Sequence, residues 1–463
     1  MIDSTPNPLR FPPVSGLSVR AEFDGGALSS DFGPLLLQGV DRQTGLIHRL
    51  ANAIHDTRHT SYVAHPLRDL LAQRIYQIAC GYEDGNDANH LRSDPLFKLS
   101  VGRRPLDEDN HLASAATLSR LENALTSRDI YRMAQAFIDG FVSSYQTPPE
   151  VIVLDMDHSE DRTHGQQAFS FYNHHYRHHC YLPLFVFEGI TGRFITAVLR
   201  NGKTPTGAEN AMIMKRVMRQ LRRHWPDTRF ILRGDGHFSS PELMQLCQDD
   251  AHSDFIFGVA NNQVLKRLAA PHLKQTAHSH QIRCANARRT DQTVPVHTRT
   301  YHELDYRAAS WPEGDMRLIL KAEVMMLGEN PRFVVTSLTE PAPACIYRDL
   351  YAARGQDENY IKVMKLDLAS DRTSCSGFIA NHVRLYMACA AYVLHHSLRT
   401  EVLCHTELEK AQPMTVILKL FKLAVRVVQY KDRVKLHLPS HYPLQSLMKQ
   451  VTERLFLPKP APT

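Results

Sequence analysis

Three acidic residues from distant parts of the chain are of a type and in a setting that could hold divalent metal ions. Asp157 and Asp235 each end a short apolar run, VIVLDMD and RFILRGD, and Glu358 lies further on, in YAARGQDENYIKVMK. Alternate side chains of a strand share a face, so Asp155 points the same way as Asp157 and is the alternative first ligand. A single strand-ending aspartate is an ordinary turn residue, so the hypothesis depends on the three carboxylates together.

Such a set of carboxylates suits metal-assisted phosphoryl transfer. Mg²⁺ or Mn²⁺ accepts a few protein carboxylates and fills the rest of its shell with water and phosphate. Two ions about 4 Å apart can clamp the attacking and the leaving oxygen of an in-line displacement. We therefore expect two metal ions in the site, bound by Asp155 or Asp157, by Asp235 and by Glu358.

A row of charged residues surrounds the glutamate. Tyr351, Arg354, Glu358, Lys362 and Lys365 follow one another at steps of 3, 4, 4 and 3 residues, so a helix places them in one continuous stripe. Cations beside the glutamate could hold DNA phosphates next to the metals. The alternative is a solvated helix face with an ion pair between Glu358 and Lys362.

The elements that must position these residues form an α/β pattern. Short runs rich in Val, Ile, Phe and Leu predict five strands, and one segment between them has its apolar residues at helical spacing. The predicted strands are VIVLDMD, YLPLFVFE, GRFITAVLR, TRFILRGDG and DFIFGVA, and the helix is GAENAMIMKRVMRQLRRHW, with Met214, Val217, Met218 and Leu221 on one face. This order predicts a mixed sheet with helices packed on it.

The flanking regions have a different character. Residues 1–145 are predicted to be mostly helical, and residues 262–332 to be an inserted, mainly antiparallel subdomain containing VHTRTYHEL, DYRAAS and DMRLILKAEVM. From Tyr347 the pattern is helical again, up to a final helix, MTVILKLFKLAV. The alternating run VRVVQYKDRVKLHL that follows predicts a hairpin.

The composition is that of a soluble globular protein, with 43% apolar and 22% charged residues in 463. Eight cysteines occur without a C-x-x-C pair, so we expect neither a disulfide framework nor a cysteine zinc site, as in a reducing cytoplasm. The polar start MIDSTPNPLRFPPV predicts no secretory leader, and the longest apolar stretch, 385–394, is too short to cross a bilayer. We expect a cytoplasmic protein without a membrane partner.

Positive charge gathers in two segments. The net charge is +6, and one cluster holds Lys215, Arg216, Arg219, Arg222 and Arg223. The other holds Lys266, Arg267, Lys274, Arg283, Arg288 and Arg289. Together they favour a nucleic-acid partner over two solvated helix faces.

A third segment has the pattern of a DNA-reading helix. In Ser114–Leu125, Thr117, Ser119 and Arg120 could enter a DNA groove. A plain amphipathic surface helix explains the same pattern equally well.

Two rival hypotheses place the protein in other classes. The segment NHHYRHHC holds His174, His175, His178, His179 and Cys180, whose helical spacing could bind zinc. It lacks the glutamate of an H-E-x-x-H motif, which argues against a zinc enzyme. A non-catalytic DNA-binding protein is the second rival, and the intact set of carboxylates argues against it.

The sequence resembles the DDE transposases of bacterial insertion sequences, in the group with a Y-x2-R-x3-E-x6-K signature. Tyr351, Arg354, Glu358 and Lys365 match that signature at every spacing. Finer features resemble the insertion-sequence 1380 group, and the likeness extends from about Asp31 to Pro443. These features are GYEDGND, LDMDHSEDRTHGQQ, CYLPLFVFEG, LRNGKTP and ENYIKVMK.

The resemblance implies a fold and a set of domains. The expected core is an RNase H-like catalytic domain of the retroviral integrase type, residues 146–261 and 333–400, interrupted by a β-rich insertion at 262–332. A helical N-terminal DNA-binding region, 1–145, would precede it, and a mixed C-terminal region, 401–463, a candidate for dimerisation, would follow.

The resemblance also implies an activity. The protein would bind the terminal inverted repeats of its element, cleave DNA there with Mg²⁺ or Mn²⁺, and join the 3′-hydroxyl ends to target DNA, as a homodimer associated with the nucleoid. Asp157 is favoured as first ligand because Asp157-His158-Ser159 fits the family's D-x-[ST] motif, although His158 stands where relatives often have a small residue. Trp311 would stack on a flipped base, unless it covers the insertion's own core.

Overall fold

The computed structural model describes residues 8–457, so the polar start MIDSTPN and the last six residues of the expected C-terminal region lie outside the described chain. The chain forms two compact units. One comprises the chain up to Leu125, together with Asp367–Ala369 and the chain from Met387 onward, and the other comprises Thr126–Leu366 and Ser370–Tyr386. The second unit holds the predicted α/β pattern, beginning at residue 126 instead of 146.

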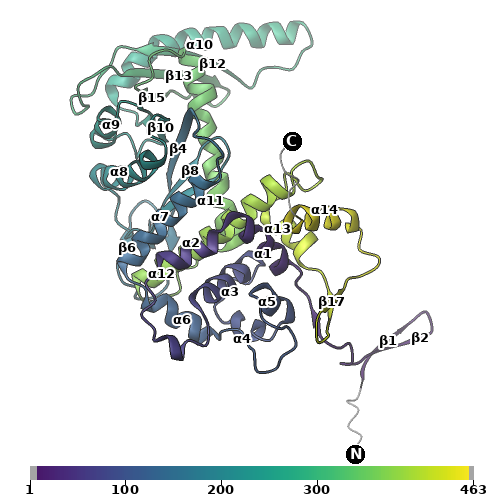
Figure 1. Ribbon diagram of the computed structural model, residues 1–463. Coiled ribbons are helices and arrows are strands. Elements are labelled where there is room, and N and C mark those ends of the chain that lie inside the picture. The colour runs from purple at the N-terminus through teal and green to yellow at the C-terminus, as the bar shows by residue number, and fades with distance from the viewer. Residues whose placement is uncertain (1–7, 458–463) are drawn as a thin grey trace, which may run out of the picture. The chain divides into compact units, whose positions relative to one another are not determined.

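A nine-stranded mixed sheet forms the centre of this second unit (Figure 1). Its order is β12-β13-β15-β11-β10-β4-β8-β9, with β14 paired to β13. The strands are β4 (Val151–His158), β8 (Leu184–Glu188), β9 (Phe194–Val198), β10 (Arg229–Gly234), β11 (Ser253–Val259), β12 (His297–Leu304), β13 (Arg317–Met325), β14 (Gly328–Glu329) and β15 (Arg332–Thr336). Strands β4, β10 and β11 are parallel and the other pairings are antiparallel. The predicted mixed α/β sheet is therefore confirmed, with all five predicted strands in it.

Helices α7 (Ser127–Ser143), α8 (Gly207–His224) and α9 (Pro241–Gln248) pack on one face of this sheet, and so does α10 (Gln263–Arg289) further along it. Both α7 and α8 begin with a capping box, in which Thr126 and Asp129, and then Thr206 and Glu209, satisfy the first free backbone N–H groups. The four apolar residues that predicted α8 are all buried in the same core as Ile152, Leu154 and Met156 of β4. The face of α8 away from this core carries its charged residues.

The opposite face of the sheet is covered by the segment that follows β15. Val153 and Ile231 pack there against Ile346 and Tyr347 of a π-helical stretch, η2 (Cys345–Tyr351). This stretch continues into η3 (Ala352–Arg354) and α11 (Gly355–Leu368). The predicted helical segment from Tyr347 is confirmed. Its first turns are not α-helical, since η2 is a wider π-helix and η3 a tighter 3-10 helix. The segment from η2 to α11 thus covers the face of the sheet toward which Asp155 and Asp157 point.

Residues 262–332 differ from the expected β-rich subdomain in their first half. Gln263–Arg289 form a 27-residue helix, α10, which Asn262 caps and in which Pro271 is accommodated. Leu265, Ala269 and Leu273 form its buried stripe, a helical spacing that its many histidines and the proline obscure in the sequence. The strands that follow, β12 to β14, are antiparallel as predicted but join the central sheet, and DYRAAS is a loop with no strand.

The first unit is largely helical, as predicted. Its helices are α1 (Gly33–Thr44), α2 (Leu46–Ala53), η1 (Thr60–Tyr62), α3 (Leu67–Ala79), α4 (Asp87–Leu91), α5 (Pro95–Ser100), α6 (Ala115–Ala124), η4 (Leu398–Val402), α13 (Pro413–Val416), η5 (Ile417–Phe421) and α14 (Gln445–Phe456), while α12 (Phe378–Ser397) contributes to both units. Its strands are β1 (Leu9–Val14), β2 (Leu17–Ala21), β3 (Leu28–Ser29), β16 (Val425–Gln429) and β17 (Val434–His437). The hairpin β16–β17 was predicted, whereas β1 to β3 and α14 were not. No described helix has the length and apolar character needed to span a bilayer.

The candidate DNA-reading segment is helix α6. Ser114 caps it, and Ser119 and Arg120 are exposed. Arg120 donates hydrogen bonds to the carbonyl of Ala116 and to Oγ1 of Thr117, at 3.2 Å each, so it lies along its own helix. The helix exists as expected, and its contact with a DNA groove stays a prediction.

Candidate functional site

Two of the predicted carboxylates lie at one end of the central sheet, where strands β4 and β10 finish. This end, formed by the carboxyl ends of these strands, is the edge at which the candidate site lies. Strands β4 and β10 are parallel neighbours in a register that pairs Asp155 with Arg233 and Met156 with Gly234. The next residues along the two strands are Asp157 and Asp235, so both follow the last paired positions at the same edge. They come together because the carboxyl ends of parallel strands lie side by side.

The two aspartates have opposite electrostatic surroundings. Burial raises the pKa of Asp157 to about 7, against the charge of Arg354 and with the help of the negative charge of Asp235. Burial alone would also raise the pKa of Asp235, but hydrogen bonds from His237 lower it below its ordinary value. The backbone N–H and Nδ1 of His237 lie 2.9 Å from the two oxygens of Asp235. Sequence reasoning did not single out His237, although it lies only two residues beyond the aspartate.

Glu358 is brought to the same place by a shared arginine. The guanidinium of Arg354 lies 3.7 Å from Oδ2 of Asp157 and 3.1 Å from Oε1 of Glu358. The Glu358 side chain is 63% exposed, whereas the Asp157 side chain is 14% exposed. Asp157 and Glu358 thus both contact one cation, with Glu358 on the solvent side, and the charge of Arg354 also acts on Asp235. In the part of the chain that the structure describes, no three acidic, histidine or cysteine side chains are already close enough to enclose a metal ion.

The oxygen donors nevertheless fit a hard divalent cation. Asp157 is buried beside another carboxylate, and Arg354 is the cation that offsets its charge. A carboxylate in this setting gains from further positive charge, which a divalent ion supplies. Asp157, Asp235 and Glu358 are the residues that would hold it.

Asp155 has a different partner. Both of its oxygens accept hydrogen bonds from Arg233, and both side chains are almost fully buried. Arg233 also donates to the carbonyls of Leu350 and Gly189, so its guanidinium joins β10 to the segment before Glu358 and to the end of β8. Because all the oxygens of Asp155 are engaged inside the sheet, the geometry favours Asp157 as the ligand.

A further carboxyl group, Asp357, is buried beside this ion pair. Burial and the negative charge of Asp155 raise the pKa of Asp357 to about 10. Asp357 is therefore neutral at physiological pH and lies next to Glu358 on the inner side of α11. Sequence reasoning missed it, since the pattern of the helical stripe drew attention only to its neighbour.

The tyrosine and lysines of the Y-R-E-K stripe have separate surroundings. Tyr351 packs on Tyr347, with ring centroids 5.4 Å apart, and a side chain at Gly258 would come within 2.5 Å of the Tyr351 hydroxyl. Lys362 is exposed. Lys365 donates to the carbonyl of Glu160 and lies 3.9 Å from the buried carboxylate of Asp161. Lys365 thus contacts the loop after β4 instead of pointing to solvent.

His158 is held within the site's wall. Its ring stacks on Phe238 at 4.4 Å between centroids, and Arg200 donates to Nδ1. Burial and the positive charge of Arg200 lower the pKa of His158 to about 3, so this ring is neutral. His158, which stands where relatives often have a small residue, therefore supports the strand end by packing.

The histidine cluster does not have the helical geometry expected for zinc. His174 to Cys180 span the turn of a hairpin between β6 (Phe171–Asn173) and β7 (His178–Tyr181), to which β5 (Asp161–Arg162) is added. His178 and His179 therefore point to opposite faces of a strand. The prediction of a helical zinc site is wrong, because a turn and not a helix connects the histidines. In this turn Oδ1 of Asn173 accepts hydrogen bonds from the backbone N–H groups of His175 and Tyr176.

Trp311 is 9% exposed and belongs to the main core of the unit. Its ring meets Tyr306 edge to face, with centroids 5.8 Å apart. This is the packing role that was weighed against base stacking. Trp225, at the end of α8, is buried against Phe141 and Tyr145 of the α7 region, as expected of a packing residue.

Comparison with known proteins places this chain in a family. No curated protein matches the chain. Among solved structures, the piggyBac transposase in a synaptic complex with hairpin DNA is similar over 84% of this chain and 80% of that one, with 14% sequence identity and a TM-score of 0.41. A family model described as "Transposase DDE domain group 1" matches residues 11–459. The chain therefore belongs to the DDE transposases, a family of metal-dependent enzymes that cleave DNA and transfer its strands.

Proposed function

We propose that this protein binds the terminal inverted repeats of an insertion sequence, cleaves DNA at its ends and joins the freed 3′-hydroxyls to target DNA. The observation that carries the proposal is the grouping of Asp157, Asp235 and Glu358 around Arg354 at one edge of the sheet. Two divalent ions, Mg²⁺ or Mn²⁺, when bound there, would activate the attacking oxygen and stabilise the leaving one.

The protein's own residues have distinct parts in this proposal. Asp157 and Asp235 would hold the metals at the rigid ends of two strands, and Glu358 would complete the set from α11. Arg354 lies between Asp157 and Glu358 and is placed to contact a phosphate of the bound DNA. The neutral ring of His158 and the hydrogen bonds of His237 fix the strand ends.

The finer family assignment is part of the proposal. We propose an RNase H-like core made of β9, β8, β4, β10 and β11, in that order, of which the last three are parallel. The match of Tyr351, Arg354, Glu358 and Lys365 to the Y-R-E-K spacing supports the group with that signature, and in particular the insertion-sequence 1380 group. Synapsis of two ends implies a homodimer, and the work on DNA implies association with the nucleoid.

The test uses a supercoiled plasmid that carries the coding frame with its natural flanking DNA. With Mg²⁺, the wild-type protein should release the element, whereas Asp157→Ala, Asp235→Ala and Glu358→Ala should each abolish cleavage and still bind the ends. Asp315→Ala, which removes an exposed carboxylate of the same unit, is the matched control and should cut normally. Normal cutting by Asp235→Ala would rule out the proposed site.

A further inference from the structure

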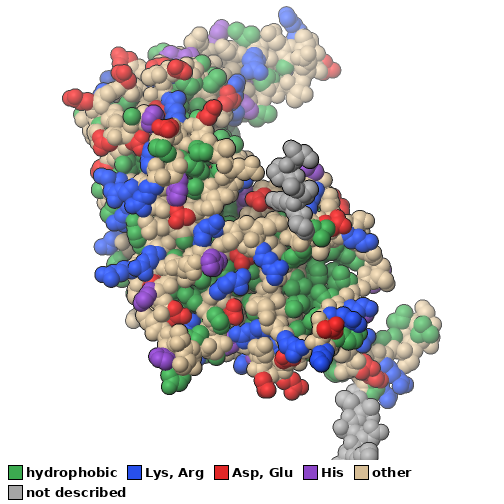
Figure 2. Space-filling model, in the orientation of Figure 1, with side chains coloured by type: hydrophobic (Ala, Val, Ile, Leu, Met, Phe, Trp, Pro, Cys, Tyr) green, Lys and Arg blue, Asp and Glu red, His purple; other side chains and the backbone are tan. Residues whose placement is uncertain are grey.

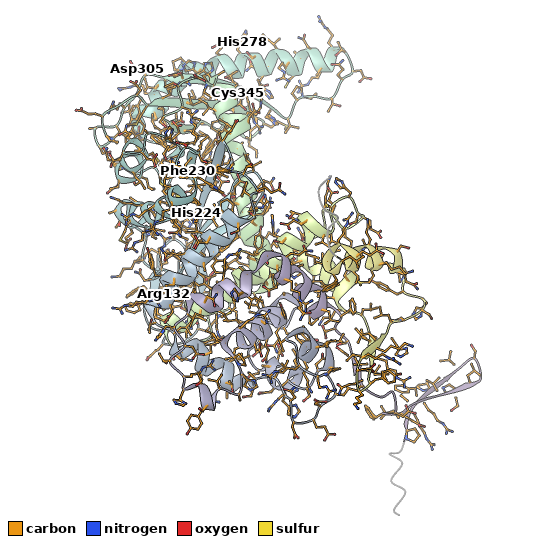
Figure 3. The ribbon with its side chains drawn as sticks, viewed as in Figure 1. Arg132, His224, Phe230, His278, Asp305 and Cys345 are labelled. Atoms are coloured by element: carbon orange, nitrogen blue, oxygen red, sulfur yellow. The ribbon has the colours of Figure 1, made fainter. Side chains whose placement is uncertain are left out.

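Helices α7 and α8 present a continuous basic surface, here called the α7–α8 face. Figure 2 shows Lys and Arg side chains gathered over these helices, and Figure 3 marks Arg132 on α7 and His224 at the end of α8. All the cations of the face are exposed. They are Arg128, Arg132, Lys215, Arg216, Arg219 and Arg223.

Few acidic side chains lie beside this face: of its six cations, Lys215 lines a hollow together with the exposed Glu242 and Asp249. Within residues 8–457, none of its six cations forms an ion pair. Asp129 and Glu209 are used in the capping boxes at the two helix starts. Asp139 accepts hydrogen bonds from Gln220 and lies 3.2 Å from Nε2 of His224. Unpaired arginines in such number cost mutual repulsion, which an anionic partner relieves.

By contrast, Arg222 of the same helix is structural. It forms a two-pronged ion pair with Asp250, 2.9 Å at each contact, and covers the ring of Phe230. Its neighbours in the sequence, Arg219 and Arg223, make no such contacts with acids. The cations of α8 therefore fall into one that packs and several that face outward.

A hollow on this face has the chemistry of a phosphate site. It measures about 430 Å³ and is lined by Ser127, Arg128, Tyr131, Arg132 and Arg216. The guanidinium of Arg216 lies 5.9 Å from the centre of the Tyr131 ring, which orients it. Guanidinium groups and hydroxyls are the side chains that most often bind phosphate oxygens.

The face also has a direction. Helix α7 leads into β4 and α8 leads into β10, so both helices run antiparallel to strands whose far ends carry the candidate site. The starts of α7 and α8 therefore lie toward the edge with Asp157 and Asp235, and the last turn of α8 lies toward the other edge. The 18 residues of α8 span about 27 Å, which corresponds to about 8 base pairs of B-DNA at 3.4 Å each.

We propose that the α7–α8 face binds the sugar–phosphate backbone of the duplex that flanks the cleaved bond. The inference rests on the proposed function for its link to cleavage, but its DNA-binding part is tested separately. The contacts are made to phosphates, so they position the duplex without reading its sequence. The hollow between Arg128, Arg132 and Arg216 takes one phosphate, and the row from Lys215 to Arg223 follows the strand away from the sheet edge.

Binding is measured with a labelled 40-base-pair duplex of random sequence, by fluorescence anisotropy at several salt concentrations. Arg128→Glu/Arg132→Glu and, independently, Arg216→Glu/Arg219→Glu should weaken binding at least tenfold near 100 mM salt. The slope of log Kd against log salt should fall by about 2, since each lost phosphate contact removes about 0.9. The control Lys410→Glu/Lys449→Glu makes the same change in net charge at exposed residues outside the face and should bind within twofold of wild type.

Wild-type affinity in both face variants, or an equal loss in the control, would overturn the proposal. Cleavage then tests the flank. On a donor with a long flanking duplex, the face variants should cut at least tenfold more slowly than wild type. On a donor that keeps the element end but has its flanking duplex trimmed close to the bond, they should match wild type. Equal cutting of both donors would overturn the assignment to the flank. If Asp235→Ala cuts normally, the proposed function fails while the binding result stands on its own.

Discussion

The buried pair between Asp155 and Arg233 allows a sharp test of which aspartate of β4 has which role. Both side chains are removed from solvent, and Arg233 lies among an aspartate and two carbonyls. Asp155→Ala leaves this guanidinium without its counter-charge inside the sheet. Breaking a buried pair in this way costs about 3–5 kcal/mol, because the remaining charge is neither hydrated nor paired.

The assay follows from the positions of the tryptophans. The chain has two, Trp225 and Trp311, and both are buried in the core of the unit that holds the central sheet. Denaturant unfolding followed by tryptophan fluorescence therefore reports the free energy of unfolding of that unit. Asp155→Ala should shift the midpoint by the amount above, whereas Asp157→Ala should not destabilise the unit, because it removes a carboxylate for which burial is already unfavourable.

Two further variants control the interpretation. In Asp155→Ala/Arg233→Met both charges are gone, so the loss should be smaller than the sum of the two single losses. In Asp155→Ala/Asp357→Asn the carboxyl group that could ionise and replace Asp155 is neutralised, so the loss should exceed that of Asp155→Ala alone. If every Asp155 variant lost less than about 1 kcal/mol of unfolding free energy, the view that this ion pair stabilises the unit would be refuted.

Substitution of Gly189 provides an independent perturbation of the ion pair between Asp155 and Arg233. A Cβ at this position would come within 2.5 Å of Nη2 of Arg233 and of Oδ2 of Asp155. Gly189→Ala should therefore push the pair apart and destabilise the unit while leaving every charge in place. A variant as stable as wild type would mean that the pair can move without loss.

Three more predictions concern the same unit. In metal-free buffer, the contribution of Asp157 should make the unit less stable as pH rises from about 4 to about 7, by up to about 4 kcal/mol. Burial raises the pKa of Asp157 to about 7 from 3.8, so the folded state keeps a proton that the unfolded state releases. Asp157→Asn should remove this dependence of stability on pH. Trp311→Ala should lower the free energy of unfolding by about 3–5 kcal/mol, because it opens a cavity. The fluorescence of the remaining tryptophan reports this loss. Full stability with stalled cleavage would favour base stacking instead. Lys365→Met should lower the unfolding midpoint, because Asp161 loses its cation, and leave DNA affinity unchanged; lower affinity at full stability would favour the phosphate contact.

The parts of the fold that the sequence predicts well are those in which one pattern dominates. The runs before Asp157 and Asp235 contain the uninterrupted apolar stretches VIVL and FIL, and a parallel pairing of their strands brings both aspartates to one end of the sheet. Helix α8 was equally clear, since its apolar stripe is regular. In α10 the stripe is regular too, but Pro271 and the many cationic side chains hide it, and packing on β12 and β13 decides its conformation.

The three candidate ligands come from the sequence and stay a prediction, whereas the residues that surround and support them were not predicted. Arg233 could have been identified from the sequence, because an arginine inside the run RFILRGD must be paired if it is buried. Asp155 has the same signal within VIVLDMD. Their alternation with Asp235 and Asp157 places both on one face. Asp357 could not have been found in this way, since its burial depends on how α11 lies against the sheet.

The charges on this face of the sheet are arranged in layers along β4 and β10. Val153 and Ile231 form an apolar layer, and Asp155 and Arg233 form the next one, in which the charges cancel. The last layer holds Asp157 and Asp235, with Glu358 beside them and Arg354 as the guanidinium between them. Three carboxylates and one guanidinium share this last layer, so it holds more acidic than basic groups. The same residue type two positions apart on β4 therefore has two roles, because one aspartate is opposite an arginine and the other is opposite an aspartate.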